Sequence, residues 1–293
     1  MAELTLALKV DGTELTIALD DRRAPRTAAA LLASLPAVVD LHCAKIAGNH
    51  LFWHAPFVVP LEAAADVMAA APGSLLYWPD RQFVELIYGE LQAETASVNL
   101  LGMLVGDLAP LRALGERLRR EQGHRRFDAR LEAMAGAAPR ATPPPLPPVA
   151  RLRCHRERMW AAEPAEVADL LARRGVMLPG GPLLMAESEA RKLQEQLWLL
   201  LMHDAADDPT FAARAACRLL VGARSRLDGL CGLREAGAVL ALAGRELAAH
   251  PDLAAPLLEE AVLYAGRLAA WLDRRLPWHD LNLAVLTAVD DWA

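Results

Sequence analysis

Glu85 is the residue of this sequence whose type and surroundings most directly suggest chemistry. It lies inside Phe83-Val-Glu-Leu-Ile-Tyr88, a run whose apolar neighbours predict a strand buried on both faces. A carboxylate in such a place is costly unless it is paired or used, and burial is expected to raise its pKa towards neutrality. A glutamate with a raised pKa can act as a general acid or base at neutral pH. The alternative is a structural salt bridge to Lys45 or Arg81.

Two histidines and a tryptophan follow the predicted turn at Gly48-Asn49, in the run His50-Leu-Phe-Trp-His54. On a regular strand the two histidines share a face but stand about 13 Å apart, at about 3.3 Å per residue. That separation is too large for one metal ion, so we predict no metal site and favour acid–base or hydrogen-bonding roles. The alternative is that both are ordinary polar residues at the edge of a strand.

Aromatic residues near Glu85 are candidates for the wall of a cavity. Tyr77, Trp78 and Tyr88 lie on the same or the preceding predicted strand. Aromatic residues in strands belong to the core more often than to a binding site. We therefore keep both interpretations open for these side chains.

A mixed α and β region must position these residues. Residues 3–19 predict a hairpin around Asp11-Gly12, a dipeptide suited to a tight turn. A short helix over 28–35 should end at Pro36. Runs rich in Val, Ile, Phe, Trp and Tyr predict strands over 37–46, 51–59, 74–78 and 82–88, with a helix at 61–71. Strands clustered with few helices between them favour an antiparallel α+β sheet or barrel.

The remainder of the chain has helical patterns. Apolar stripes predict helices from 108 to 137. Residues 139–148 hold the proline-rich stretch expected of an extended linker. Beyond it we expect helices near 164–174, 185–205, 209–228, 231–249 and 251–275, several of which begin at a proline. We predict an α+β domain over 1–138, a linker over 139–150 and a helical bundle over 151–293.

The composition argues against several classes of protein. With a net charge of −6 and a pI near 5.8, the chain lacks the excess of basic residues that is typical of nucleic-acid-binding proteins. The four cysteines are scattered, and neither a signal peptide nor a long apolar run is visible, so we expect a cytoplasmic protein that binds no membrane. The phosphate-binding motifs GxGxxG and GxxxxGK[ST] do not occur. We therefore predict no nucleotide cofactor.

The order of short motifs in residues 1–107 resembles the small bacterial cyclophilin-like domains. The motifs that follow the hairpin are Pro25-Arg-Thr-Ala-Ala-Ala-Leu-Leu-Ala-Ser-Leu-Pro36, Ala44-Lys-Ile-Ala-Gly-Asn49, Ala71-Pro-Gly-Ser-Leu-Leu-Tyr77 and Glu85-Leu-Ile-Tyr-Gly89. Such a domain followed by helices, with Met177-Leu-Pro-Gly-Gly181 leading into them, is similar to the cucumopine synthase arrangement. The resemblance implies a small closed barrel with flanking helices and an all-α bundle after it.

The resemblance also implies an activity. Members of that family are cofactor-independent synthases that condense an amino acid with a 2-oxo acid by a Pictet–Spengler cyclisation. The expected partners are thus a small amine, either an amino acid or an arylethylamine, and a 2-oxo acid. For this reaction we predict Glu85 and His50 as the proton-transfer pair. The predicted substrate-binding residues are Tyr77, Trp53, His54, Lys45, Arg81 and Tyr88.

Two other functions stay open. The barrel could bind a small ligand or a peptide without catalysis, with the helical domain forming a homo-oligomer. Alternatively, Glu85 and His50 could activate water in an amide or cyclic-imide hydrolase. Peptidyl-prolyl isomerisation is not expected, because no stretch resembles the arginine- and aromatic-lined groove of the eukaryotic isomerases.

Overall fold

A computed structural model describes residues 4–92, 95–134, 145–172 and 180–290. The chain divides into two compact units. The first unit combines the residues up to 141 with those from 277 onwards, and the second contains residues 142–276. The predicted linker at 139–150 lies partly outside the described residues, so that boundary stays a prediction.

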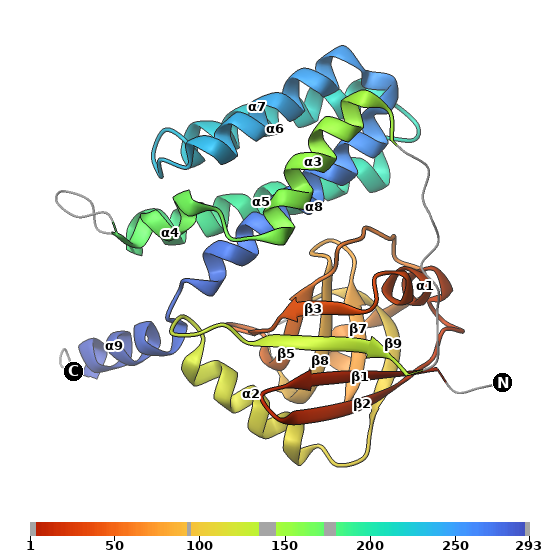
Figure 1. The fold of residues 1–293 in the computed structure, drawn as a ribbon, viewed down its shortest axis with the longest axis vertical. Helices are drawn as coiled ribbons and strands as arrows, with labels where there is room; N and C mark the ends of the chain where they lie inside the picture. The colour runs from red at the N-terminus through yellow and green to blue at the C-terminus, as the bar shows by residue number, and fades with distance from the viewer. Residues whose placement is uncertain (1–3, 93–94, 135–144, 173–179, 291–293) are drawn as a thin grey trace. The chain divides into compact units, whose positions relative to one another are not determined.

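The first unit is built on a ten-stranded antiparallel sheet that forms a small, nearly closed barrel (Figure 1). The strands pair in the order β3-β10-β1-β2-β9-β7-β8-β5-β4, and β6 pairs with β9. Their bounds are β1 Thr5–Val10, β2 Thr13–Leu19, β3 Ala37–Asp40, β4 His42–Cys43, β5 Gly48–His54, β6 Ala64–Asp66, β7 Ser74–Trp78, β8 Phe83–Leu91, β9 Ser97–Val105 and β10 Asp128–Ala133. Since Leu41 alone separates β3 from β4 in the chain, the two ends of this order lie close together.

The predicted hairpin between β1 and β2 is confirmed. Asp11 and Gly12 form its turn with positive φ angles of 47° and 79°, and Val10 pairs with Thr13 across it. Asp and Gly tolerate this left-handed backbone better than other residues do. The turn chemistry in the sequence therefore fixes the register with which the barrel begins.

The interior of the barrel is one large apolar core. Strands from all around the sheet contribute side chains to it, among them Leu6, Ile17, Leu51, Leu75, Val84, Leu101 and Leu131. Helices α1 (Pro25–Ala33) and α2 (Ala109–Glu121) add Leu31, Leu111, Leu114 and Leu118. We call the sheet surface that faces this core the inner face and the opposite surface the outer face.

Helix α2 packs closely on the barrel at Tyr88. A Cβ atom on Gly115 would lie 2.4 Å from a ring carbon of Tyr88, so only glycine permits this approach. The short helix α9 (Trp278–Asp290) groups with this unit, and Nε2 of His124 lies 2.5 Å from Oδ2 of Asp280 in it. The prediction had assigned this last segment to the helical bundle.

Two predicted helical segments of the first unit differ from the structure, and one strand was not predicted. The helix expected at 61–71 is instead the short strand β6 followed by a 3₁₀ turn over Val67–Ala69. The helical pattern expected to run from 108 to 137 ends with α2, and the strand β10 follows. Strand β9 had not been predicted. In β10 the buried Ala129 and Leu131 alternate with exposed neighbours, a period of two that short apolar runs do not distinguish from a helical stripe.

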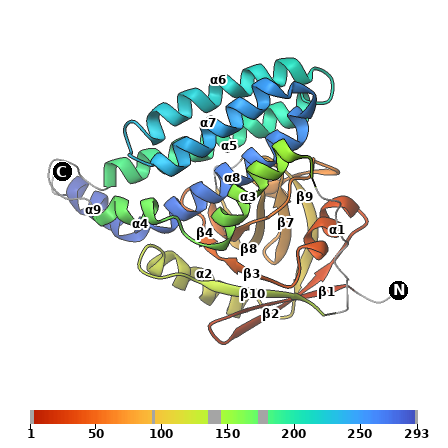
Figure 2. The same ribbon diagram turned by 45° about the horizontal axis from the view of Figure 1, so that its top comes forward.

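The second unit is helical. Its elements are α3 Pro147–Ala161, α4 Ala165–Ala172, α5 Gly180–His203, α6 Pro209–Leu227, α7 Arg234–Ala249, a 3₁₀ turn Pro251–Leu253 and α8 Ala254–Arg274. Helix α8 contacts α3, α5, α6 and α7, and α6 runs beside α7 (Figures 1 and 2). Helix α3 begins inside the stretch predicted as linker, because prolines are well tolerated in a first helical turn.

The predicted start of α6 is confirmed in detail. The carboxylate of Asp208 accepts a hydrogen bond of 2.9 Å from the backbone N–H of Phe211, and Pro209 occupies the first turn. Among the helices that the structure describes, none is long and apolar enough to span a membrane.

Candidate active site

The pairing of β5 with β8 places the two predicted proton-transfer residues on one face of the sheet. Their antiparallel register sets His50 opposite Ile87, Phe52 opposite Glu85 and His54 opposite Phe83. Side chains alternate along a strand, so every second residue shares a face. The side chains of these two strands on the outer face are His50, Phe52, His54, Phe83, Glu85 and Ile87.

His50 and Glu85 approach one another on this face. Nε2 of His50 lies 3.8 Å from Oε2 of Glu85, and the two side chains are 4% and 0% exposed. Burial, aided by the positive charge of Lys45, lowers the pKa of His50 to about 3. His50 is therefore neutral at physiological pH. The pair is a buried carboxyl group beside a neutral imidazole, rather than an ion pair.

His54 lies among aromatic rings on the same face. Phe52 stacks on Phe83 with ring centroids 4.3 Å apart, and His54 meets Phe83 edge to face at 4.7 Å. His42, from β4, stacks on Phe52 at 5.2 Å and lies 5.6 Å from His54. These rings form a buried aromatic cluster next to the Glu85–His50 pair.

The two cations among the predicted substrate-binding residues, Lys45 and Arg81, lie beside rings of the outer face. Nζ of Lys45 is 5.0 Å from the ring centroid of Phe52. The guanidinium of Arg81 is 4.5 Å from the ring of Trp78, which pairs with Phe83 in the register of β7 and β8. Cations held over aromatic faces in this way gain modest attraction from the rings. The outer face therefore combines acid–base, aromatic and cationic groups.

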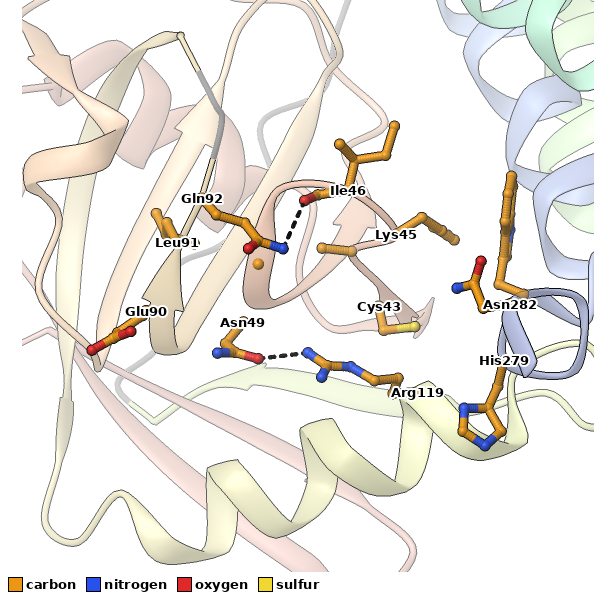
Figure 3. A pocket seen from close by; sticks show the side chains of 13 residues that line it. Cys43, Lys45, Ile46, Asn49, Glu90, Leu91, Gln92, Arg119, His279 and Asn282 are labelled. Atoms are coloured by element: carbon orange, nitrogen blue, oxygen red, sulfur yellow. Dashed lines mark hydrogen bonds between the residues drawn. The ribbon is translucent and has the colours of Figure 1, made fainter. Parts of the chain in front are cut away.

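A cleft of about 430 Å³ opens beside Lys45 within the same unit (Figure 3). Polar groups line it from Lys45, Asn49, Glu90, Gln92, Arg119, His279 and Asn282. Arg119 donates a hydrogen bond of 2.5 Å to Oδ1 of Asn49, and Gln92 donates one of 3.3 Å to the carbonyl of Ile46 (Figure 3). Lys45 thus borders both this cleft and the ring of Phe52.

Three predicted substrate-binding residues lie on the inner face instead. Trp53, Tyr77 and Tyr88 all belong to the large apolar core of the barrel. The hydroxyl of Tyr77 donates to the carbonyl of Phe57 at 3.3 Å, and that of Tyr88 accepts from Arg119 at 3.1 Å. The structure therefore does not bring these three rings together with Glu85, and packing accounts for their positions.

Several residues of the outer face were not predicted from the sequence. His42 and Phe52 are the clearest examples, both buried and both in ring contact with His54. Alternation along His50-Leu-Phe-Trp-His54 could have identified Phe52, since it stands between the two histidines on their face. The position of His42 depends on which strand pairs with β5, which no local pattern gives.

Potential metal ligands are dispersed over the described residues. Among these residues, no group of three or more His, Cys, Asp and Glu side chains is arranged to hold a metal ion. The expected absence of a metal site stays a prediction.

Comparison with known proteins supports the fold. Residues 8–121 match the family model of the cyclophilin-like family, and this segment contains the whole outer face of β5 and β8. The solved structure of McbB in complex with tryptophan is similar over 94% of this chain and 98% of its own, with a TM-score of 0.74 and 21% sequence identity. At that identity the similarity shows the fold. The predicted fold class, α+β with a cyclophilin-like barrel and a helical C-terminal region, is confirmed.

A second solved structure is similar over a smaller part of the chain. The solution structure of a hypothetical protein from Archaeoglobus fulgidus covers 44% of this chain and 94% of its own, with 19% identity and a TM-score of 0.35. No curated protein matches by sequence.

Proposed function

We propose that this chain is a condensing enzyme that joins an aromatic amine, either an amino acid or an arylethylamine, to a 2-oxo acid by a Pictet–Spengler cyclisation. The observation that carries the proposal is the buried Glu85 carboxyl beside neutral His50, next to the ring surface of the outer face. The fold shared with McbB, which was solved with tryptophan, adds support. Histidine with 2-oxoglutarate, the cucumopine synthase pair, is one substrate pair to test.

The reaction needs few protein groups. The amine nitrogen attacks the ketone carbon of the 2-oxo acid, and loss of water leaves an iminium ion. A carbon of the aromatic ring then forms the new C–C bond, and a proton leaves that ring carbon. Amine and 2-oxo acid thus give the cyclic product and one water, with no net electron transfer. The reaction therefore requires proton transfer and orientation, and no redox cofactor.

We assign both proton transfers to Glu85. As a carboxylic acid it assists departure of water, and as a carboxylate it accepts the proton of the ring carbon. The pKa of His50 is about 3, so its imidazole is neutral at neutral pH and it does not act as an imidazolium acid. Its proposed role is to orient the Glu85 carboxyl and to relay a proton to it. The two residues predicted as one proton-transfer pair thus take different roles in this proposal.

The proposed substrate-binding residues all lie on or beside the outer face. We propose that the aromatic ring of the amine lies against Phe52 and His54, and that Lys45 or Arg81 holds a carboxylate. Trp53, Tyr77 and Tyr88 take no part in this proposal, because they belong to the core of the barrel. The predicted domain boundary, cytoplasmic location and homo-oligomer also remain proposals.

Mass spectrometry of the purified protein incubated with pairs of amines and 2-oxo acids tests the function. We expect an enzyme-dependent mass equal to amine plus acid less one water. Glu85→Gln should abolish it, while Glu14→Gln, which changes an exposed glutamate of β2, should leave it intact. If no pair yields product, the alternative of a non-catalytic ligand-binding protein replaces the proposal. Product formed equally by Glu85→Gln would retain the synthase but remove Glu85 from it.

A further inference from the structure

The helical unit contains a pocket of its own. It encloses about 540 Å³ and is lined by residues of α3, α4, α7 and α8 together with the short segment between α3 and α4. A cavity of this size is in the range that binds small molecules. It contains none of the residues proposed for the condensation reaction, so its ligand can be inferred independently of that reaction.

Two sets of hydrogen bonds join the helices that line this pocket. At one end, Arg151 of α3 donates two hydrogen bonds of 2.8 Å to the Glu246 carboxylate of α7. At the other end, the carboxylate of Glu166 in α4 accepts 2.8 Å hydrogen bonds from the backbone N–H groups of Glu235 and Ala236, at the start of α7. Helix α3 is thus fastened to the last turns of α7 and α4 to its first turn, so that α3 and α7 run antiparallel with the pocket between them.

The floor of the pocket is apolar and carries one hydroxyl group. Met159, Val239 and Tyr264 are all at least nine-tenths buried and line the pocket. Tyr264 contributes the phenolic hydroxyl group among these three lining residues. Burial, together with the carboxylates of Glu166 and Glu235, raises the pKa of Tyr264, so the hydroxyl stays protonated. A protonated phenol that lines a pocket can donate a hydrogen bond to a ligand.

Charges of both signs stand at the rim. Arg158, Glu235 and Arg245 are exposed and line the pocket, and none forms an ion pair with another described residue. Glu163 also lines it, but its carboxylate already accepts from Arg274 and Arg275. The rim therefore offers guanidinium groups and one carboxylate to a ligand above an apolar floor.

We propose that this pocket binds a free amino acid with an apolar or aromatic side chain. The side chain lies against Met159, Val239 and Tyr264. The carboxylate of the ligand pairs with Arg158 or Arg245, and its ammonium group pairs with Glu235. A zwitterion matches rim charges of both signs, whereas a simple acid or a simple amine leaves one sign without a partner.

Calorimetric titration of the full chain with L-phenylalanine tests the proposal. Ala238 is an exposed residue of α7 that lines the pocket, so Ala238→Trp should fill it. Ala248 is exposed on the same helix but does not line the pocket, so Ala248→Trp is the matched control. We expect Ala238→Trp to weaken a phenylalanine site at least tenfold and Ala248→Trp to leave it unchanged. Tyr264→Phe, which retains the ring, should weaken it severalfold.

The identity of the ligand class is tested by two analogues. N-acetyl-L-phenylalanine lacks the positive charge and phenethylamine lacks the carboxylate, so each should bind at least tenfold more weakly than L-phenylalanine. Equal binding of either analogue would overturn the zwitterion assignment. Absence of phenylalanine binding, or equal binding to the Ala238→Trp and Ala248→Trp variants, would overturn the site itself.

Discussion

The two faces of strands β5 and β8 are equally buried but differ in chemistry. On the inner face, Leu51, Trp53 and Leu86 are at most 2% exposed and join the core of the barrel. On the outer face, His50 and Glu85 are at most 3% exposed, yet both carry polar groups. Burying polar groups costs free energy that apolar residues of similar size would not cost. Burial alone therefore does not distinguish residues that pack the core from candidate catalytic residues. Residue type, taken together with the alternation of side chains along each strand, does distinguish them.

Removing a large side chain from the inner face should have the greatest effect on stability. Trp53→Ala deletes a buried ring and leaves a cavity, which typically costs about 3–5 kcal/mol. Urea denaturation measures this loss directly. Ile46→Ala, at a position that is 77% exposed, should change stability by less than about 0.5 kcal/mol. Equal effects of the two substitutions would show that the inner face is not the main packing surface.

Because His50 is buried on the outer face, the stability of the folded protein should depend on pH. The pKa of His50 is about 3 in the folded protein, against about 6.5 in an unfolded chain. Between these values the unfolded state binds more protons, so stability is complete above pH 6.5 and falls as pH decreases towards 3. From pH 7 to pH 5 the loss due to His50 should be about 2 kcal/mol, at 1.36 kcal/mol per pKa unit.

Chemical denaturation at pH 7 and pH 5 measures this dependence. His50→Gln should remove most of it, because glutamine does not titrate. His203→Gln, which changes an exposed histidine of α5, should leave it in place. A wild-type protein equally stable at both pH values would mean that His50 is not held in its neutral form.

A smaller change on the inner face should lower stability only slightly. Tyr77→Phe keeps the buried ring and removes one hydrogen bond of 3.3 Å to the carbonyl of Phe57. A single neutral hydrogen bond of this kind contributes about 1 kcal/mol or less. Urea denaturation should therefore give a loss within that range. A loss comparable to that of Trp53→Ala would mean that the Tyr77 hydroxyl holds a larger network in place.

Much of the fold follows from local signals. The Asp11-Gly12 turn and the start of α6 at Pro209 are properties of a few adjacent residues, and both were predicted. Strand β10 was not, because Phe127, Leu131 and Met134 fit a helical stripe as well as a strand. Its pairing with β1 and β3 decides between the two, and pairing is a tertiary property.

The candidate site was partly predictable for the same reason. A period of two along β5 already separates Trp53 from His50, and along β8 it separates Tyr88 from Glu85. Tyr77 is different, because its face relative to Glu85 depends on the register of β7, in which Leu76 is the residue opposite Glu85. Register between strands is set by the whole sheet, so no local pattern could have assigned Tyr77 to the core.

The outer face is proposed to carry out the chemistry while the inner face supports it. The most direct test compares initial rates of product formation for Glu85→Gln and Tyr77→Phe, with an amine and 2-oxo acid pair that the wild-type protein converts. Removing a general acid or base should lower the rate about 100-fold or more, so we expect that loss for Glu85→Gln and less than about a twofold change for Tyr77→Phe. Comparable losses in both variants, or a greater loss in Tyr77→Phe, would contradict the account.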